Sequence, residues 1–275
     1  DLHLSLRRQR QMCIRDRAKE IRINCLKLTN AAKSSHLGSM FSCADILAVL
    51  YGNVLKLNPK QPMSLDRDYF LQSKGHAGCA QYVCLSKLGF FDEKILSTYY
   101  QNGSKLGGHI SHKGINGVEI STGSLGHALS IGSGIALELK KLNKKNRVFV
   151  LLSDGELDEG SNWEAILFAP HHNLNNLTCI VDYNKLQSLT SVKETLNLEP
   201  LVDKILSFGW DVFDIDGHNH DDIKNAIKAK TSKPKFIIAN TTKGKGISFM
   251  ENKVVWHYRS PNEDELIKGL KELEE

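Results

Sequence analysis

The sequence lacks several features that would each place it in another class of protein. It has no run of about 18 apolar residues, so we expect no membrane-spanning helix and no membrane partner. Its six cysteines form no C-x-x-C pair and no zinc-type spacing, which predicts reduced, mostly buried thiols in a cytoplasmic protein. No G-x-G-x-x-G follows a first strand with an acid about twenty positions later, which argues against a dinucleotide-binding dehydrogenase.

The positive charge is concentrated at the amino end of the chain. The net charge is +5, and residues 1–17 hold five arginines against two aspartates, so this segment supplies most of the excess. We therefore expect no nucleic-acid-binding face. Because the segment has neither an initiating methionine nor the apolar centre of a signal peptide, we interpret residues 1–16 as a non-native or disordered tail. With no linker or repeat, residues 17–275 are expected to form a single domain.

Apolar runs alternate with helical patterns along the chain. Apolar residues recur at helical spacing in segments 17–33, 42–54, 126–142, 199–209, 220–229 and 262–275. Short apolar runs that predict strands occupy 68–72, 147–153, 177–181, 210–216 and 234–242. Ser42 is expected to be the N-cap of the second helix. This alternation predicts an α/β fold with a mostly parallel sheet and helices on both faces.

Two polar residues follow two of these expected strands. Asp154 and Gly155 come directly after the run that ends at Ser153, and Asn184 follows 29 residues after this glycine. The carboxyl ends of parallel strands meet at one edge of the sheet, where ligands of such folds bind. A carboxylate and an amide oxygen beside a glycine turn suit a Mg²⁺ ion that also takes ligands from a diphosphate. The pattern predicts a metal-diphosphate site.

Four of the eleven histidines lie where the chain reverses or beside glycine, namely His36, His76, His109 and His257. A neutral imidazole both donates and accepts hydrogen bonds, and it titrates near physiological pH. These histidines therefore suggest one pocket for a polyhydroxylated substrate. Nine of the 21 glycines fall between Gly103 and Gly134, where the backbone could approach a ligand closely. The other histidines considered, which we interpret as helix-face or cap residues, are His127, His171, His172, His218 and His220.

The segment from Ser153-Asp-Gly155 to Tyr183-Asn184 resembles the thiamine diphosphate motif, which is glycine-aspartate-glycine, about thirty residues, then asparagine. Ser153 stands where the family usually has glycine. The wider resemblance, from about residue 17 to the carboxyl end, is to transketolases and specifically to the amino-terminal half of a split transketolase. It implies a thiamine diphosphate-binding fold, with thiamine diphosphate and Mg²⁺ as cofactors; Ca²⁺ or Mn²⁺ could take the place of Mg²⁺.

The resemblance also implies roles for individual residues. It gives the four histidines the catalytic work of holding a donor ketose and moving protons at its carbonyl and hydroxyl oxygens. The metal would be held by Asp154, Asn184 and the backbone carbonyl of Leu186. The residues implied in cofactor binding, directly or through the subunit contact, are His76, Gly123, Leu125, Asp154, Gly155, Glu159, Asn184, Lys243 and His257.

The activity that the resemblance implies is transfer of a two-carbon ketol unit from a ketose phosphate to an aldose phosphate, as in the pentose phosphate pathway. A glutamate needed for this chemistry comes from a pyrimidine-binding domain, so we expect activity only with a second, carboxy-terminal subunit, in an α₂β₂ assembly.

Three alternatives stay open. A split relative could act on a sulfosugar or a branched sugar phosphate. A deoxyxylulose-phosphate synthase fits His36, His109 and the Trp256-His257 ending less well. A non-catalytic binding module could have kept the fold.

Overall fold

The computed structural model describes residues 13–275. Helix α2 (Ile14–Ala32) begins three residues before the expected start, and the Cys13 sulfur accepts a hydrogen bond from the Asp16 backbone N–H. Residues 13–16 thus belong to the first helix and its N-cap, and the rest of the expected tail, residues 1–12, lies outside the described residues. In the described chain no helix combines the length and apolarity that crossing a membrane requires. All six cysteines are free, and only Cys13 is exposed.

A five-stranded parallel sheet forms the centre of the fold, with strand order β1-β2-β3-β5-β4. Its strands are β1 (Tyr69–Gln72), β2 (Val148–Ser153), β3 (Leu177–Tyr183), β4 (Asp211–Asp216) and β5 (Lys235–Asn240). Each expected strand is present. β3 extends two residues past its apolar run, so Asp182 lies within the strand, paired with Ser153 of β2.

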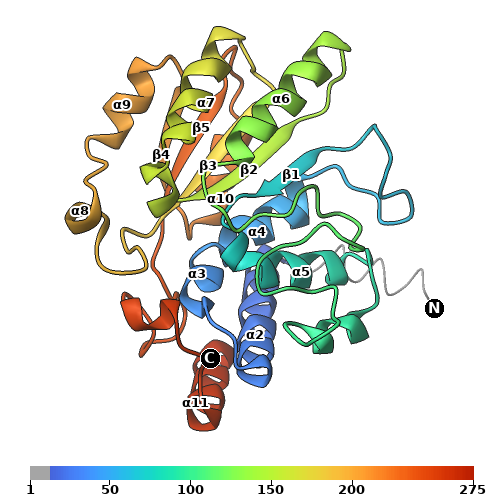
Figure 1. Ribbon diagram of the computed structural model, residues 1–275, viewed down its shortest axis with the longest axis vertical. Coiled ribbons are helices and arrows are strands. Elements are labelled where there is room, and N and C mark those ends of the chain that lie inside the picture. The colour runs from blue at the N-terminus through green and yellow to red at the C-terminus, as the bar shows by residue number, and fades with distance from the viewer. Residues whose placement is uncertain (1–12) are drawn as a thin grey trace.

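Helices cover both faces of the sheet (Figure 1), which confirms the expected fold class. One face carries α6 (Ala128–Lys141), α7 (Gly160–His171) and α9 (Leu201–Ser207). The other face carries α2, α4 (Ala44–Val49), α5 (Gly78–Lys87) and α10 (His220–Lys228). The final helix α11 (Glu263–Glu274) packs on α2, and Lys19 Nζ donates to the Glu274 carbonyl at 2.7 Å. The shorter elements are α3 (Leu37–Ser42), η1 (Leu50–Val54), η2 (Gly75–Ala77), η3 (Glu93–Thr98), η4 (Gly155–Asp158), α8 (Val192–Thr195) and η5 (Val254–His257).

The internal strand β2 shows why its polar groups can reach a ligand only at the strand end. All six of its residues are buried. Val148, Val150 and Leu152 join the apolar cluster under α6 and α7, whereas Phe149 and Leu151 join the cluster on the opposite face. A parallel strand covered on both faces has no solvent-facing side chains along its length. Its polar groups are therefore available to a ligand at the carboxyl end, where Asp154 follows.

The expected N-cap at Ser42 is wrong. Ser42 is instead the last residue of α3, and its hydroxyl donates to the buried Asp182 carboxylate at 2.5 Å. The second expected helix begins at Ala44 and continues through the wider turn of η1 to Val54. A serine hydroxyl satisfies a cap and a buried carboxylate equally well, and only the tertiary arrangement brings Asp182 within reach.

Candidate functional site

The four selected histidines converge from four separate segments. His36 precedes α3, His76 lies in η2, His109 lies in the loop before α6, and His257 ends η5. The His36 ring lies 5.4 Å from the His76 ring, 5.4 Å from the His109 ring and 4.9 Å from the His257 ring, centre to centre. We call these residues the histidine cluster. Its imidazoles form a compact set of hydrogen-bonding groups.

The backbone of His36 holds two of these segments together. Its N–H donates to the His257 carbonyl at 2.9 Å. It adopts φ +73°, a left-handed conformation that is uncommon outside glycine, although histidine adopts it more often than most residues. The chain is thereby turned sharply between α2 and α3, so that the imidazole joins the cluster.

The histidine cluster is held in the neutral state. Burial, followed by the neighbouring His109, lowers the pKa of His36 to about 4, and burial, followed by Lys243, lowers the pKa of His257 to about 3. Burial and then Lys74 hold the pKa of His76 well below its usual value, and burial also lowers that of His109. A neutral imidazole has a free acceptor nitrogen, so it can take a proton from a hydroxyl group without first releasing one of its own.

We predict that the ring protons of His36 and His257 show no titration between pH 8 and pH 5.5 in proton–carbon NMR spectra. The exposed His112 provides a reference ring outside the cluster. Because the unfolded chain would take up protons near pH 6.5 and the folded rings only near pH 4 and 3, acid should destabilise the fold progressively below about pH 6.5. Titration of either ring near pH 6.5 would contradict this description of the cluster.

Lys243 links the histidine cluster to the end of β3. It is 1% exposed, and its ammonium donates to the carbonyls of Leu186 (2.8 Å) and Gln187 (3.1 Å) and lies 3.2 Å from His257 Nδ1. Burial is the main cause that lowers the pKa of Lys243, to about 8. A buried cation at this position suits an anionic group such as a phosphate.

The candidate metal ligands lie on two adjacent turns, after β2 and after β3, which are joined by the bond from Lys185 N–H to Asp154. Asp154 follows β2, and its two carboxylate oxygens accept from the backbone N–H groups of Gly155 (2.8 Å) and Lys185 (2.6 Å). The Asn184 side-chain oxygen accepts from the Leu186 N–H at 3.1 Å. Asp154, Asn184 and the Leu186 carbonyl are all hard oxygen donors, the type that Mg²⁺ prefers.

The surroundings of the Asp154 carboxylate indicate whether a cation fits at this position. Asp154 is 2% exposed, and burial, then the nearby Asp182, raises its pKa to about 7. Within residues 13–275 no side-chain cation forms an ion pair with it, and no group of three His, Cys, Asp or Glu side chains is placed to hold a metal ion. A buried carboxylate without a cationic partner is stabilised by a bound divalent ion, so these donors fit Mg²⁺ completed by diphosphate and water.

Glycines leave room around the predicted cofactor site. A Cβ atom at Gly155 would lie 3.1 Å from the Gln187 side chain, and one at Gly123 would lie 3.2 Å from the His109 ring. Gly123 also has φ +157°, which disfavours other residues. Leu125, in the same loop, is half-buried. Glu159 lies apart from the histidine cluster: it is exposed and sits against Gly126.

Sequence patterns missed a buried ion pair beneath the site. Lys74, two residues after the end of β1, and Asp182 in β3 are both completely buried and form a salt bridge, and Lys74 also donates to the Ser39 carbonyl at 3.1 Å. Burial alone would lower the pKa of Lys74, but Asp182 raises it above its usual value; Lys74 likewise holds the pKa of Asp182 below its usual value against the effect of burial. An aspartate inside an apolar run was the available signal, since such a residue needs a partner.

The interpretation of His218 as a helix-face or cap residue is wrong. His218 lies in the turn after β4, with Nδ1 2.8 Å from an Asp45 oxygen and Nε2 accepting from the Thr242 backbone N–H at 2.8 Å. His220, the first residue of α10, binds the other Asp45 oxygen at 2.8 Å. Because Thr242 precedes Lys243, this network holds the loop that carries Lys243. Its position beyond a strand end was the signal that could have identified His218.

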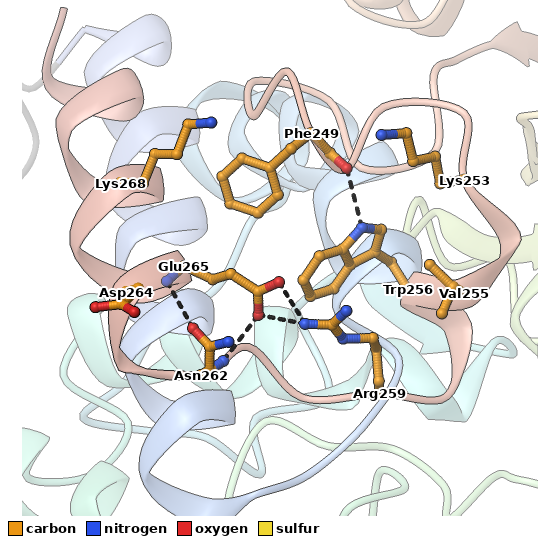
Figure 2. Close-up of a pocket in the computed structure, with 9 residues that line it drawn as sticks. All are labelled: Phe249, Lys253, Val255, Trp256, Arg259, Asn262, Asp264, Glu265 and Lys268. Carbon is orange, nitrogen blue, oxygen red and sulfur yellow. Dashed lines mark hydrogen bonds and ion pairs between the residues drawn. The ribbon is translucent and has the colours of Figure 1, made fainter.

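The segment that carries His257 is held in place by contacts of the neighbouring residues Trp256 and Arg259 (Figure 2). The Trp256 indole donates to the Phe249 carbonyl at 3.1 Å, and the Arg259 guanidinium lies over the Trp256 ring at 4.4 Å while pairing with Glu265. These residues border a hollow of about 450 Å³ beside α11. Another hollow, of about 700 Å³, lies along β4. No member of the histidine cluster lines either hollow.

Comparison with known proteins places this geometry in a family. Residues 14–273 match the family model of the transketolase thiamine diphosphate binding domain. A relative from Actinobacillus succinogenes, named as one of the subunits of an apulose-4-phosphate transketolase, is 41% identical over 94% of this chain and 95% of its own. The 6-deoxy-6-sulfo-D-fructose transketolase subunit SqwG of Clostridium sp. (strain MSTE9) is 37% identical over 97% of this chain and 98% of its own.

The fold is also found in solved transketolases. The crystal structure of transketolase from Campylobacter jejuni superposes with a TM-score of 0.90 at 32% identity, and covers 95% of this chain but 42% of the solved one. The chain therefore spans about two fifths of the length of that transketolase. It belongs to the transketolase family, as the domain that binds thiamine diphosphate.

Proposed function

We propose that this chain is the cofactor-binding, amino-terminal subunit of a split transketolase, which transfers a two-carbon ketol unit between sugars in the cytoplasm. The observation that supports this most strongly is the histidine cluster, joined through Lys243 to the Leu186 carbonyl in the turn after β3, where the Lys185 N–H donates to Asp154. It combines a set of neutral proton carriers with a site for a metal-bound diphosphate.

The residues of the site would have different roles in binding the cofactor, according to their position. Asp154, Asn184 and the Leu186 carbonyl would hold Mg²⁺ at the diphosphate, and Lys243 would neutralise further phosphate charge. Gly123, Leu125 and Gly155 would shape the space for the rest of the cofactor. When bound, thiamine diphosphate supplies the carbon that carries the two-carbon unit.

The histidine cluster would act on the sugar. Each neutral imidazole has one donor and one acceptor nitrogen, so it can orient a hydroxyl and then take or return its proton. His36 and His257 would hold the donor ketose at its carbonyl and hydroxyl oxygens, and His76 and His109 would complete the ring of donors and acceptors. Glu159, at the surface near Gly126, would act indirectly through a subunit contact.

The substrate has two candidate classes. The first class is the ketose phosphates of the pentose phosphate pathway. It is supported by similarity to one-piece transketolases, of which the human protein is 35% identical over 90% of this chain. A specific observation favours the other: two relatives that match this chain over nearly their whole length are named for apulose 4-phosphate and 6-deoxy-6-sulfo-D-fructose. We therefore propose a specialised ketose donor, with apulose 4-phosphate placed before 6-deoxy-6-sulfo-D-fructose because of the higher identity.

The partner follows from the same relatives. Both are named as subunits, and the solved transketolase continues well beyond the matched part. We propose a second subunit that contributes the pyrimidine-binding domain, including the glutamate that acts on the aminopyrimidine ring. Two-fold symmetry is usual for such assemblies, so an α₂β₂ complex is the expected form.

The test uses the reconstituted complex with three donors: apulose 4-phosphate, 6-deoxy-6-sulfo-D-fructose and an unbranched pentulose phosphate. We expect ketol transfer from at least one donor. His36→Ala and His257→Ala should each lower kcat by about ten- to ten-thousandfold, with the metal and cofactor retained, because each removes a proton-transfer group.

His112→Ala is the matched control, because His112 is exposed and binds the Ser121 hydroxyl instead of joining the histidine cluster. Its rate should equal that of the unmodified complex. Tight binding of thiamine diphosphate without transfer from any donor would contradict the proposed activity and favour a binding module. Unchanged rates in both cluster variants would remove the proposed role of these histidines.

A further inference from the structure

Glu156 is a buried carboxylate to which the sequence motif assigned no role. It lies in η4, between the end of β2 and the start of α7, and its residue is 0% exposed. Glu159, three residues later, is exposed. A buried carboxylate needs hydrogen-bond donors, so the groups that Glu156 contacts indicate what it does.

Three different segments donate to this one side chain. Oε1 accepts from the Ser73 hydroxyl and from the Gly126 backbone N–H at 2.8 Å, and Oε2 accepts from the Ser153 backbone N–H at 3.3 Å. Ser73 directly follows β1, Ser153 ends β2, and Gly126 ends the loop before α6. Glu156 thus lies where these three segments meet.

Each of these segments carries residues of the proposed site. Ser73 leads to His76, Ser153 leads to Asp154, and Gly126 closes the loop that contains Gly123 and Leu125. Glu156 itself contacts none of those site residues through the bonds described. Its carboxylate instead fixes the spacing between the three backbone segments.

The loop of residues 122–126 depends on this contact more than the strands do. The strand ends are already held by the sheet ladder, with Gln72 paired to Leu151 and Ser153 paired to Asp182. Gly126 has φ +88°; its N–H is bound by Glu156 and its carbonyl accepts from the Ser161 hydroxyl at 2.7 Å. The N–H and the carbonyl of Gly126 are therefore both hydrogen-bonded, and Glu156 is the acceptor for the N–H.

A carboxylate is the side chain that this position needs. Backbone N–H groups can only donate, and the N–H groups of Gly126 and Ser153 point at different oxygens of Glu156. Both oxygens must therefore accept. A glutamine at this position would turn its NH₂ toward one of the two N–H groups in either orientation. Even with its oxygen kept toward Ser73 and Gly126, its NH₂ would face the Ser153 N–H and displace the side chain that holds Gly126.

We propose that Glu156 is a positioning residue that sets the loop of residues 122–126 against the ends of β1 and β2, and thereby sets the affinity for thiamine diphosphate. This rests on the proposed function, because the loop is assigned there to the cofactor. A Glu156→Gln variant should bind thiamine diphosphate about ten- to a hundredfold more weakly, as expected for one buried bond to a charged acceptor. At saturating cofactor its kcat should change by less than about threefold.

The measurements are calorimetric titration of thiamine diphosphate into the complex with the second subunit, and hydrogen exchange of the cofactor-free chain. Amide exchange in residues 122–128 should be faster in Glu156→Gln, while exchange in β3 should be unchanged. Glu164→Gln is the matched control, since Glu164 is exposed on α7, and it should behave as the unmodified chain in both measurements. Should Glu156→Gln fail to fold, Ser73→Ala removes a single donor and should weaken cofactor binding about two- to tenfold.

The outcomes separate this inference from the proposed function. Unchanged cofactor affinity in the folded variants, or weaker binding without faster exchange in residues 122–128, would overturn the positioning role while leaving the proposed function intact. A uniform loss of thermal stability with unchanged affinity would likewise overturn it. If the unmodified complex does not bind thiamine diphosphate, the proposed function fails, and the role of Glu156 toward the cofactor fails with it.

Discussion

Replacing Asp154 by alanine is expected to abolish Mg²⁺-dependent binding of thiamine diphosphate and to leave the fold intact. Asp154 is the single carboxylate in the predicted metal site, and it is buried. The other two donors, Asn184 and the Leu186 carbonyl, are neutral. Without the negative charge the site cannot offset the loss of water around a divalent ion, so the affinity should fall by at least about a hundredfold.

The fold should tolerate the change because the carboxylate is poorly stabilised without a cation. Burial, and then the nearby Asp182, raises the pKa of Asp154 to about 7, so ionisation is costly there. Removing the charge relieves this repulsion, and the N–H groups of Gly155 and Lys185 each lose one acceptor. We expect these effects largely to cancel.

Tryptophan fluorescence of the complex, titrated with thiamine diphosphate in Mg²⁺ and again in a chelator, measures the effect. Asp154→Asn keeps the shape and removes the charge, so its affinity should lie between those of the alanine variant and the unmodified chain. Asp203→Ala, on the exposed side of α9, is the control and should bind normally. Equal cofactor affinity in Asp154→Ala and the unmodified complex would sink the metal assignment.

The second large effect is the dependence on a partner. The isolated chain should show no ketol transfer, and activity should appear when the pyrimidine-domain subunit is added. The neighbouring helices α6 and α7 expose Ile131, Leu167 and Phe168, with 61% of Leu167 accessible. These neighbouring helices thus offer exposed apolar side chains to a protein partner. Self-association of the chain alone is therefore also expected.

Size-exclusion chromatography with light scattering, run with and without the second subunit, gives the assembly directly. We expect a mass that corresponds to two copies of each chain, and ketol transfer that elutes with this species and requires added thiamine diphosphate. Leu167→Ser should reduce assembly, whereas Leu65→Ser, at an exposed position in the loop before β1, should not. Transfer by the isolated chain at the rate of the mixture would refute the shared site.

The features that were predictable from sequence are those with a local signal. The strands were recognisable because apolar residues buried on both faces of a parallel sheet form continuous runs. The same runs located Asp154 and Asn184, and the glycine-flanked turns located the histidine cluster. The chemical roles of these residues stay predictions until the variants are measured.

The features that were missed depend on partners distant in sequence. Lys74 and Asp182 are separated by 108 positions, and no local pattern predicts that one will neutralise the other. Ser42 looked like a helix cap because its hydroxyl suits that role, and its actual acceptor, Asp182, is 140 positions away. Glu156 was hidden among neighbouring acids, since burial and not residue type distinguishes it from Glu159.

The left-handed backbone of His36 has a consequence for how this domain could evolve. Glycine or asparagine would adopt φ +73° more easily, and the conformation costs a bulkier residue about 1–2 kcal/mol. Random substitution at this position therefore includes changes that make the domain more stable while removing one imidazole. If the histidine cluster acts on substrate as proposed, the imidazole of His36 is therefore retained at a cost in backbone conformation.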